Sequence, residues 1–110
     1  MVDKKPSPHS ELVQHARNMG NVVNSLNSVQ LNEDETNGGL SVGVKMADKL
    51  FSAAQAQDGR ARAGFTRMGL MHLENVATAI GVLHPNSRHH QSALMVVALA
   101  KEAAAKYLLQ

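Results

Sequence analysis

The chain has no cysteine and no tryptophan, and its 110 residues include one tyrosine and two phenylalanines. Without cysteine there is no disulfide scaffold, no thiolate metal site and no cysteine nucleophile, and the redox compartment is left undetermined. No window approaches the roughly 18 consecutive apolar residues of a membrane-spanning helix, and the first residues lack the apolar stretch of a secretory signal. We therefore expect a cytoplasmic protein without a membrane partner.

An excess of charge of one sign is also missing. Eleven Lys and Arg residues oppose nine Asp and Glu residues, and a net charge of +2 is too small to indicate nucleic-acid binding by itself. The sequence contains neither of the glycine-rich phosphate-binding patterns, G-x-x-x-x-G-K-[ST] and G-x-G-x-x-G, and no Glu-x-x-His or His-x-x-x-His pair. We expect no cofactor and no native metal site.

The residues that are present favour helices, because alanine occurs fifteen times and no strand-length stretch alternates apolar with polar residues. We expect a flexible N-terminus over 1–7, a first helix from Pro8, and an acidic, glycine-rich connecting loop over 31–39. The next two helices are expected from about Leu40 to Gln57 and from about Arg60 to His84, and Ser87 is a suitable N-cap for a fourth helix that reaches the chain end.

Apolar residues recur at steps of three and four along these helices, as one buried side of a helix requires. The short loops favour antiparallel neighbours, so residues 1–110 are expected to form one all-α domain, an up-and-down antiparallel four-helix bundle that dimerisation could complete. The segment from Ala93 to Ala100 is apolar nearly all round, which is typical either of a central helix or of half of an interface. The expected core positions are Leu12, Ala16, Met19, Val23, Leu26, Leu40, Val44, Ala47, Leu50 or Phe51, Ala54, Phe65, Met68, Leu73, Val76, Ile80 and Leu83. Tight helix crossings are expected at Gly43, Gly64, Gly69 and Gly81.

One side of the first helix carries uncharged polar residues where a water-exposed helix usually carries Lys and Glu. Asn and Ser are poor helix formers, so their use here suggests a hydrogen-bonding surface covered by another protein, although a frayed helix with a neutral polar face is an equal alternative. The residues of this predicted partner-binding face are Gln14, Asn18, Asn21, Ser25 and Ser28. Methionines supply adaptable apolar surface or simply fill the core; these are Met19, Met46, Met68, Met71 and Met95.

Basic residues gather near the predicted start of the third helix, where cations oppose the helix dipole and something is expected to offset the cost. A phosphate contact is one explanation, and a solvated charged face is the more common one. With no aromatic residues among these cations, base stacking on single strands has no platform. The topology would collect the following residues at one pole: Arg60, Arg62, Arg67, Lys4, Lys5 and Lys106.

A catalytic site has little support. The segment Gly39-Leu40-Ser41-Val42-Gly43 matches the G-x-S-x-G pattern of hydrolases, but that elbow needs a strand and a parallel sheet. The acidic residues cluster in loops and at helix ends instead of converging in a pocket. We therefore expect a non-enzymatic module, an adaptor, inhibitor or antiactivator that binds or sequesters a partner protein and itself forms a homodimer. The alternative is a small helical subunit of a nucleoprotein complex that contacts phosphates through the basic pole.

Overall fold

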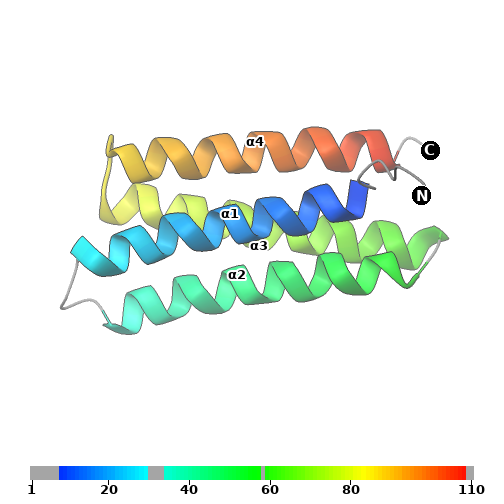
Figure 1. Cartoon of the computed structure of the whole chain (residues 1–110), viewed down its shortest axis with the longest axis horizontal. Helices are drawn as coiled ribbons and strands as arrows, with labels where there is room; N and C mark the ends of the chain where they lie inside the picture. Colours follow the sequence, from blue (N-terminus) through cyan, green and yellow to red (C-terminus); the bar gives the residue numbers. More distant parts are fainter. Residues whose placement is uncertain (1–7, 30–33, 58, 109–110) are drawn as a thin grey trace, which may run out of the picture.

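The computed structural model describes residues 8–29, 34–57 and 59–108, which form four helices and no strand. The helices are α1 (Pro8–Val29), α2 (Asp34–Gln55), α3 (Gly59–Leu83) and α4 (Arg88–Leu108). Successive helices run in opposite directions, and the start of α1, the end of α4 and the turn from α2 to α3 lie at the same end (Figure 1). Each helix packs against the next, and α1 closes the ring by packing against α4. The chain is an all-α up-and-down four-helix bundle, as the sequence predicts.

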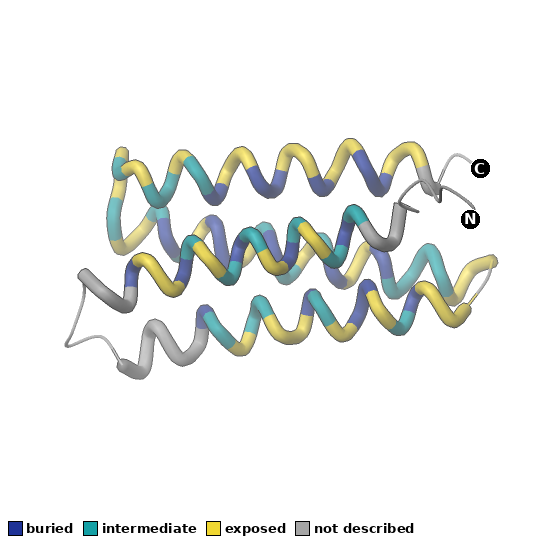
Figure 2. Tube along the Cα trace, viewed as in Figure 1, coloured by how far each residue is buried: buried dark blue, intermediate teal, exposed yellow. Residues whose placement is uncertain are grey.

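One stripe of each helix faces the centre of the bundle, as the dark segments in Figure 2 show. All five core positions predicted on α1 are buried, and on α2 the predicted positions are buried except Val44, which is half-buried. On α3 the prediction is wrong for Met68 and Leu83, which are exposed, and Phe65 is half-buried. The inward stripe of α3 runs instead through buried Thr66, Gly69, Leu73, Val76, Ala77 and Ile80.

Thr66 is a fully buried polar residue in this stripe. Its hydroxyl group donates a hydrogen bond of 2.8 Å to the backbone carbonyl of Arg62, one turn earlier in α3. That local bond satisfies the hydroxyl, which would otherwise be costly to bury. Thr66 therefore fills a core position that apolar spacing alone could not identify.

Two helix ends show how the sequence sets the boundaries. The backbone N–H of His90 donates a 3.0 Å hydrogen bond to the Ser87 hydroxyl oxygen, which confirms Ser87 as the N-cap of α4. The start of α2 differs from the prediction, because residues 34–39 are helical and not part of a connecting loop. The helix begins at Asp34, so Gly38 and Gly39 lie inside it despite the poor helix propensity of glycine, because tertiary packing further along a helix supplies most of its stability. The expected flexible segment 1–7 lies outside the described residues.

Glycines allow close approach at three of the four predicted crossings. A Cβ atom on Gly69 would lie 2.5 Å from the Phe51 ring, one on Gly43 would lie 2.7 Å from a Val76 methyl, and one on Gly81 would lie 2.5 Å from the His90 ring. The first two contacts join α2 to α3, and the third joins α3 to α4. Gly64 is different, because a Cβ there would meet nothing within 4 Å.

Candidate protein-interaction site

The methionines divide into one core residue and a surface group. Met19 is fully buried, whereas Met46, Met68 and Met71 are 39%, 46% and 50% exposed. Met95 is still more exposed, at 65%. The sequence left open whether these five methionines fill the core or supply adaptable surface. Among them, Met19 alone fills the core. The other four provide the flexible apolar surface that protein contacts use.

Three of the exposed methionines share one side of the molecule with Val42, which is also exposed. Val42 and Met46 line a groove between α2 and α3, and Asn75 of α3 lines it too. Met71 and Met68 precede Asn75 by four and seven residues, so they continue the same side of α3. We call Val42, Met46, Met68 and Met71 the α2–α3 face.

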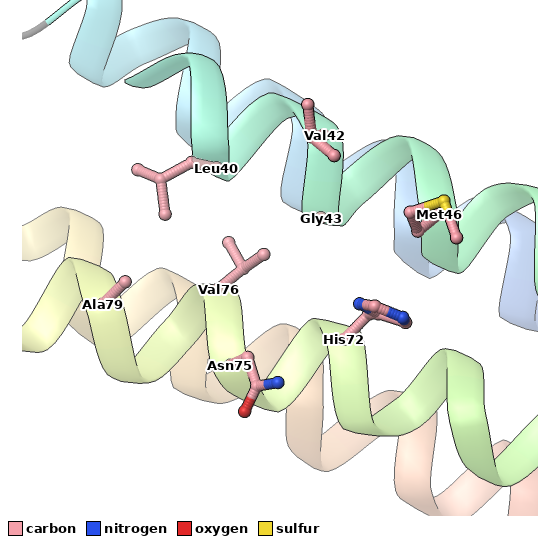
Figure 3. Close-up of a pocket in the computed structure, with 8 residues that line it drawn as sticks. All are labelled: Leu40, Val42, Gly43, Met46, His72, Asn75, Val76 and Ala79. Carbon is pink, nitrogen blue, oxygen red and sulfur yellow. The ribbon is translucent and has the colours of Figure 1, made fainter. Parts of the chain in front are cut away.

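The groove in this face has a volume of about 370 Å³ and is almost entirely apolar. Leu40 from α2 and Val76 and His72 from α3 point into the space between the two helices (Figure 3). Gly43 is part of the groove lining, and a Cβ there would lie 2.7 Å from a Val76 methyl. Its lining residues are Leu40, Val42, Gly43, Met46, His72, Asn75, Val76 and Ala79.

The outer side of α3 carries no charge beside this groove. The exposed residues Met68, Met71, Asn75, Thr78 and Val82 follow steps of three and four along one side of the helix. A helix that meets only water usually carries charged residues there, whereas the centres of protein interfaces are depleted in charge and enriched in Met. This stripe is therefore typical of a surface that another protein covers.

Two exposed cations and one paired anion border the α2–α3 face. Lys49 follows Met46 by three residues on α2, and Arg67 precedes Met71 by four residues on α3, so each lies next to an exposed methionine; both are exposed. Glu74, the one acidic residue of α3, follows Met71 by three residues and is paired with Lys101 of α4 at 2.8 Å. The edges of the face are thus suited to acidic groups of a partner.

The neutral polar side predicted on α1 is also on the surface. Gln14, Asn21 and Ser25 are exposed and Asn18 is half-buried, while the side chain of Ser28 lies outside what the structure describes. The Gln14 side-chain amide donates a 3.1 Å hydrogen bond to the Asn18 carbonyl oxygen, so these two groups satisfy each other without a partner. The adjoining groove of about 400 Å³ between α1 and α2 is lined largely by polar side chains, namely Gln14, Arg17, Ser52 and Gln55, with Val13.

The predicted basic pole is only partly assembled from described residues, because Lys4 and Lys5 lie outside them. Arg60, Arg67 and Lys106 are exposed. Arg62 donates hydrogen bonds of 3.2 and 3.4 Å to the backbone carbonyls of Ala54 and Gln55. These are carbonyls from the last turn of α2, so Arg62 caps one helix while it opens the next. The cost of a cation at the start of α3 is therefore offset inside the chain.

The residues considered for catalysis do not converge. Ser41 lies inside α2 and lines a separate groove between α1 and α2, whereas His72 lies in the groove between α2 and α3. No strand precedes Ser41 in the described part of the chain, so the context of a hydrolase elbow is missing. Across residues 8–29, 34–57 and 59–108, no three His, Cys, Asp or Glu side chains are placed to hold a metal ion together.

Sequence reasoning missed the α2–α3 face, although a signal for it is present. The steps 68, 71, 75, 78 and 82 form a second regular stripe beside the inward stripe of α3. The expected core positions mixed the two stripes, since they included Met68 beside Leu73 and Val76. Filling one core takes a narrower apolar stripe than the two stripes of α3 form together. The second stripe therefore indicates a second covered side of the helix.

The helices that the structure describes include none long and apolar enough to cross a membrane. No protein-family model matches the chain, no curated protein resembles it significantly, and no solved structure does so either. Any function must therefore be argued from the residues of this chain.

Proposed function

We propose that the protein is a non-enzymatic helical module that binds or sequesters a partner protein, as an adaptor, inhibitor or antiactivator does, through the α2–α3 face. The observation that carries the proposal is an open apolar groove lined by exposed Val42 and Met46, with exposed Met68 and Met71 further along the same side of α3. Exposed apolar side chains scattered singly need no explanation, but a group of them around a groove is typical of an interaction site. We place this module in the cytoplasm, as the sequence predicts.

The chemistry of the face favours an amphipathic helix as the bound element. A groove between two helices accepts the apolar side of a third, whose anchoring residues recur at steps of three and four. Methionine side chains adapt to such anchors, because they are unbranched and flexible. Lys49 and Arg67 at the two edges favour acidic residues beside the apolar side of the partner helix.

The groove gives little support to an enzyme. An active site brings several titratable groups together, whereas among the described residues that line this groove His72 alone is titratable. Its other polar side chain is Asn75. A single imidazole among apolar residues is suited to orienting a bound segment by one hydrogen bond.

The other surfaces have weaker support. The neutral side of α1 is accessible, but it lacks the apolar side chains whose burial supplies most of the binding free energy. Phosphate contact through the basic pole is less well supported, because Arg62, one of its cations, donates hydrogen bonds to carbonyls of α2. Both remain predictions that the same experiment tests.

Site-specific photo-crosslinking in the cells that make the protein separates these surfaces. A photoreactive amino acid is placed at Asn75 in the α2–α3 face, at Asn21 on α1, or at Arg60 in the basic pole; all three positions are exposed, so folding is preserved. We expect a discrete protein adduct from position 75 that is absent at 21 and 60, and that disappears when Met71→Lys is added. Adducts from position 21 alone, or nucleic-acid adducts from position 60, would move the function to those surfaces.

A further inference from the structure

On the outer side of α4 a cation, a large apolar residue and an anion lie in line, and a second exposed cation, Lys106, follows the anion by four residues. Arg88, Met95 and Glu102 are spaced by seven residues, so they project from the same side of the helix, and all three are exposed. Met95 lies midway between the two charges. At about 1.5 Å per residue, each charged residue is about 10 Å along the helix from Met95.

The middle of this side is apolar. The segment 93–100 contains no charged residue, and Leu94, Met95 and Leu99 within it are exposed. Figure 2 shows exposed residues recurring along the outer edge of α4, away from the other three helices. The sequence left open whether this segment is a central helix or half of an interface. In the structure α4 packs against two neighbours, α1 and α3, as each helix of the ring does, so it is not a central helix.

The two charges have no partner among the residues that the structure describes. The ion pair of α4 is formed by Lys101 with Glu74 of α3, and neither Arg88 nor Glu102 takes part in it. Arg88 is also the first residue of α4, where the positive end of the helix dipole disfavours a cation. A carboxylate brought to Arg88 from outside the chain would offset that cost.

We propose that a second copy of this chain packs on the outer side of α4, with the two α4 helices antiparallel and related by a two-fold axis at Met95. Because Arg88 and Glu102 are equally far from Met95, this arrangement places Arg88 of each protomer opposite Glu102 of its partner. The two-fold axis makes the same ion pair twice, as isologous interfaces require. A parallel arrangement would instead bring Arg88 to Arg88 and Glu102 to Glu102, so the charges select the antiparallel one.

This dimer leaves the α2–α3 face available. Helix α2 lies diagonally across the bundle from α4, since both pack against α1 and α3 and they form no substantial contact with each other. A dimer through α4 therefore presents two copies of the groove on its outside. Such a bivalent protein would bind two partner segments, or two sites on one partner, with increased avidity.

Charge reversal and restoration in the full chain test the proposal. Wild-type protein is expected to have twice the 11.8 kDa chain mass by light scattering at micromolar concentration. Arg88→Glu alone and Glu102→Arg alone each place two like-charge pairs in the interface, and each is expected to weaken dimerisation by about tenfold or more. The double variant Arg88→Glu with Glu102→Arg recreates both pairs with reversed signs and is expected to restore the dimer.

A matched reversal on the opposite corner of the bundle controls for net charge. Lys49→Glu on α2 changes an exposed cation in the same way and is expected to leave the dimer intact. Circular dichroism checks that every variant keeps its helices. A monomeric wild type, dimers that survive both single reversals, or a double variant that stays monomeric while folded would each overturn the proposal.

Discussion

At residue 69, the absence of a side chain lets two helices come into direct contact. The Phe51 ring is fully buried against the backbone of Gly69, and a Cβ there would lie 2.5 to 2.9 Å from three atoms of the ring. Non-bonded carbon atoms prefer about 3.5 to 4.0 Å, so the ring or the helix would have to move. The backbone at Gly69 is helical, so the glycine is needed for space and not for an unusual conformation.

Gly69→Ala is therefore expected to destabilise the protein. The added methyl group forces the buried Phe51 ring out of place, at a net cost of about 1 to 3 kcal/mol in the free energy of unfolding, even though Ala is the better helix former. The matched control is Gly64→Ala in the same helix, where the new Cβ meets nothing within 4 Å. That change is expected to stabilise by about 0.5 to 1 kcal/mol. Urea unfolding measures both, and effects of the same sign would contradict this account of the α2–α3 contact.

The methionines show what residue type alone does not reveal. Met19 and Met71 both fit regular helical spacing, but one is fully buried and the other half exposed. The difference depends on which of several stripes faces the bundle centre, and this follows from the packing of all four helices together. Glycine was more informative, because close packing can offset its cost inside a helix, and three of four predicted crossings are confirmed.

At the level of helices, the junction between α2 and α3 explains a sequence feature that otherwise suggested a ligand. The Arg62 side chain turns back and donates to two carbonyls at the end of α2. Those carbonyls carry the negative end of the α2 dipole, and that of Ala54 also accepts a 3.1 Å hydrogen bond from the backbone N–H of Gln57. An arginine that seems misplaced at the start of one helix thus stabilises the end of another.

Arg62→Ala is expected to lower the free energy of unfolding by about 1 to 2 kcal/mol, because it leaves the two carbonyls without their charged donor. Arg60→Ala, two residues earlier in the same exposed turn, is expected to change stability by less than about 0.5 kcal/mol. Thermal unfolding of the two variants makes the comparison. Equal effects of the two substitutions would show that Arg62 acts only through charge.

The helices themselves were predictable because each carries a regular inward stripe and ends at a recognisable signal. Ser87 caps α4 as expected. The start of α2 was not predictable from the glycines at 38 and 39, since helix formation there depends on packing further along α2. Local propensity therefore placed the helices but not this boundary.

At the level of the whole molecule, the four helices form a ring in which each has two neighbours. Each helix therefore buries one limited stripe and leaves the rest of its surface outside. The sequence predicted this bundle, but it did not show that α3 and α4 each carry more apolar residues than one core can use. Their surplus forms the α2–α3 face and the outer side of α4, on different sides of the bundle.

The central claim is that a partner protein covers the α2–α3 face, and methionine-selective labelling followed by mass spectrometry tests it most directly. Dilute purified protein is expected to be labelled at Met46, Met68 and Met71, while buried Met19 stays unlabelled as an internal control. In an extract of the cells that make the protein, these three methionines are expected to be protected together, and Met71→Lys is expected to restore labelling at Met46 and Met68. Equal labelling of the three in the purified protein and in the extract would contradict the claim.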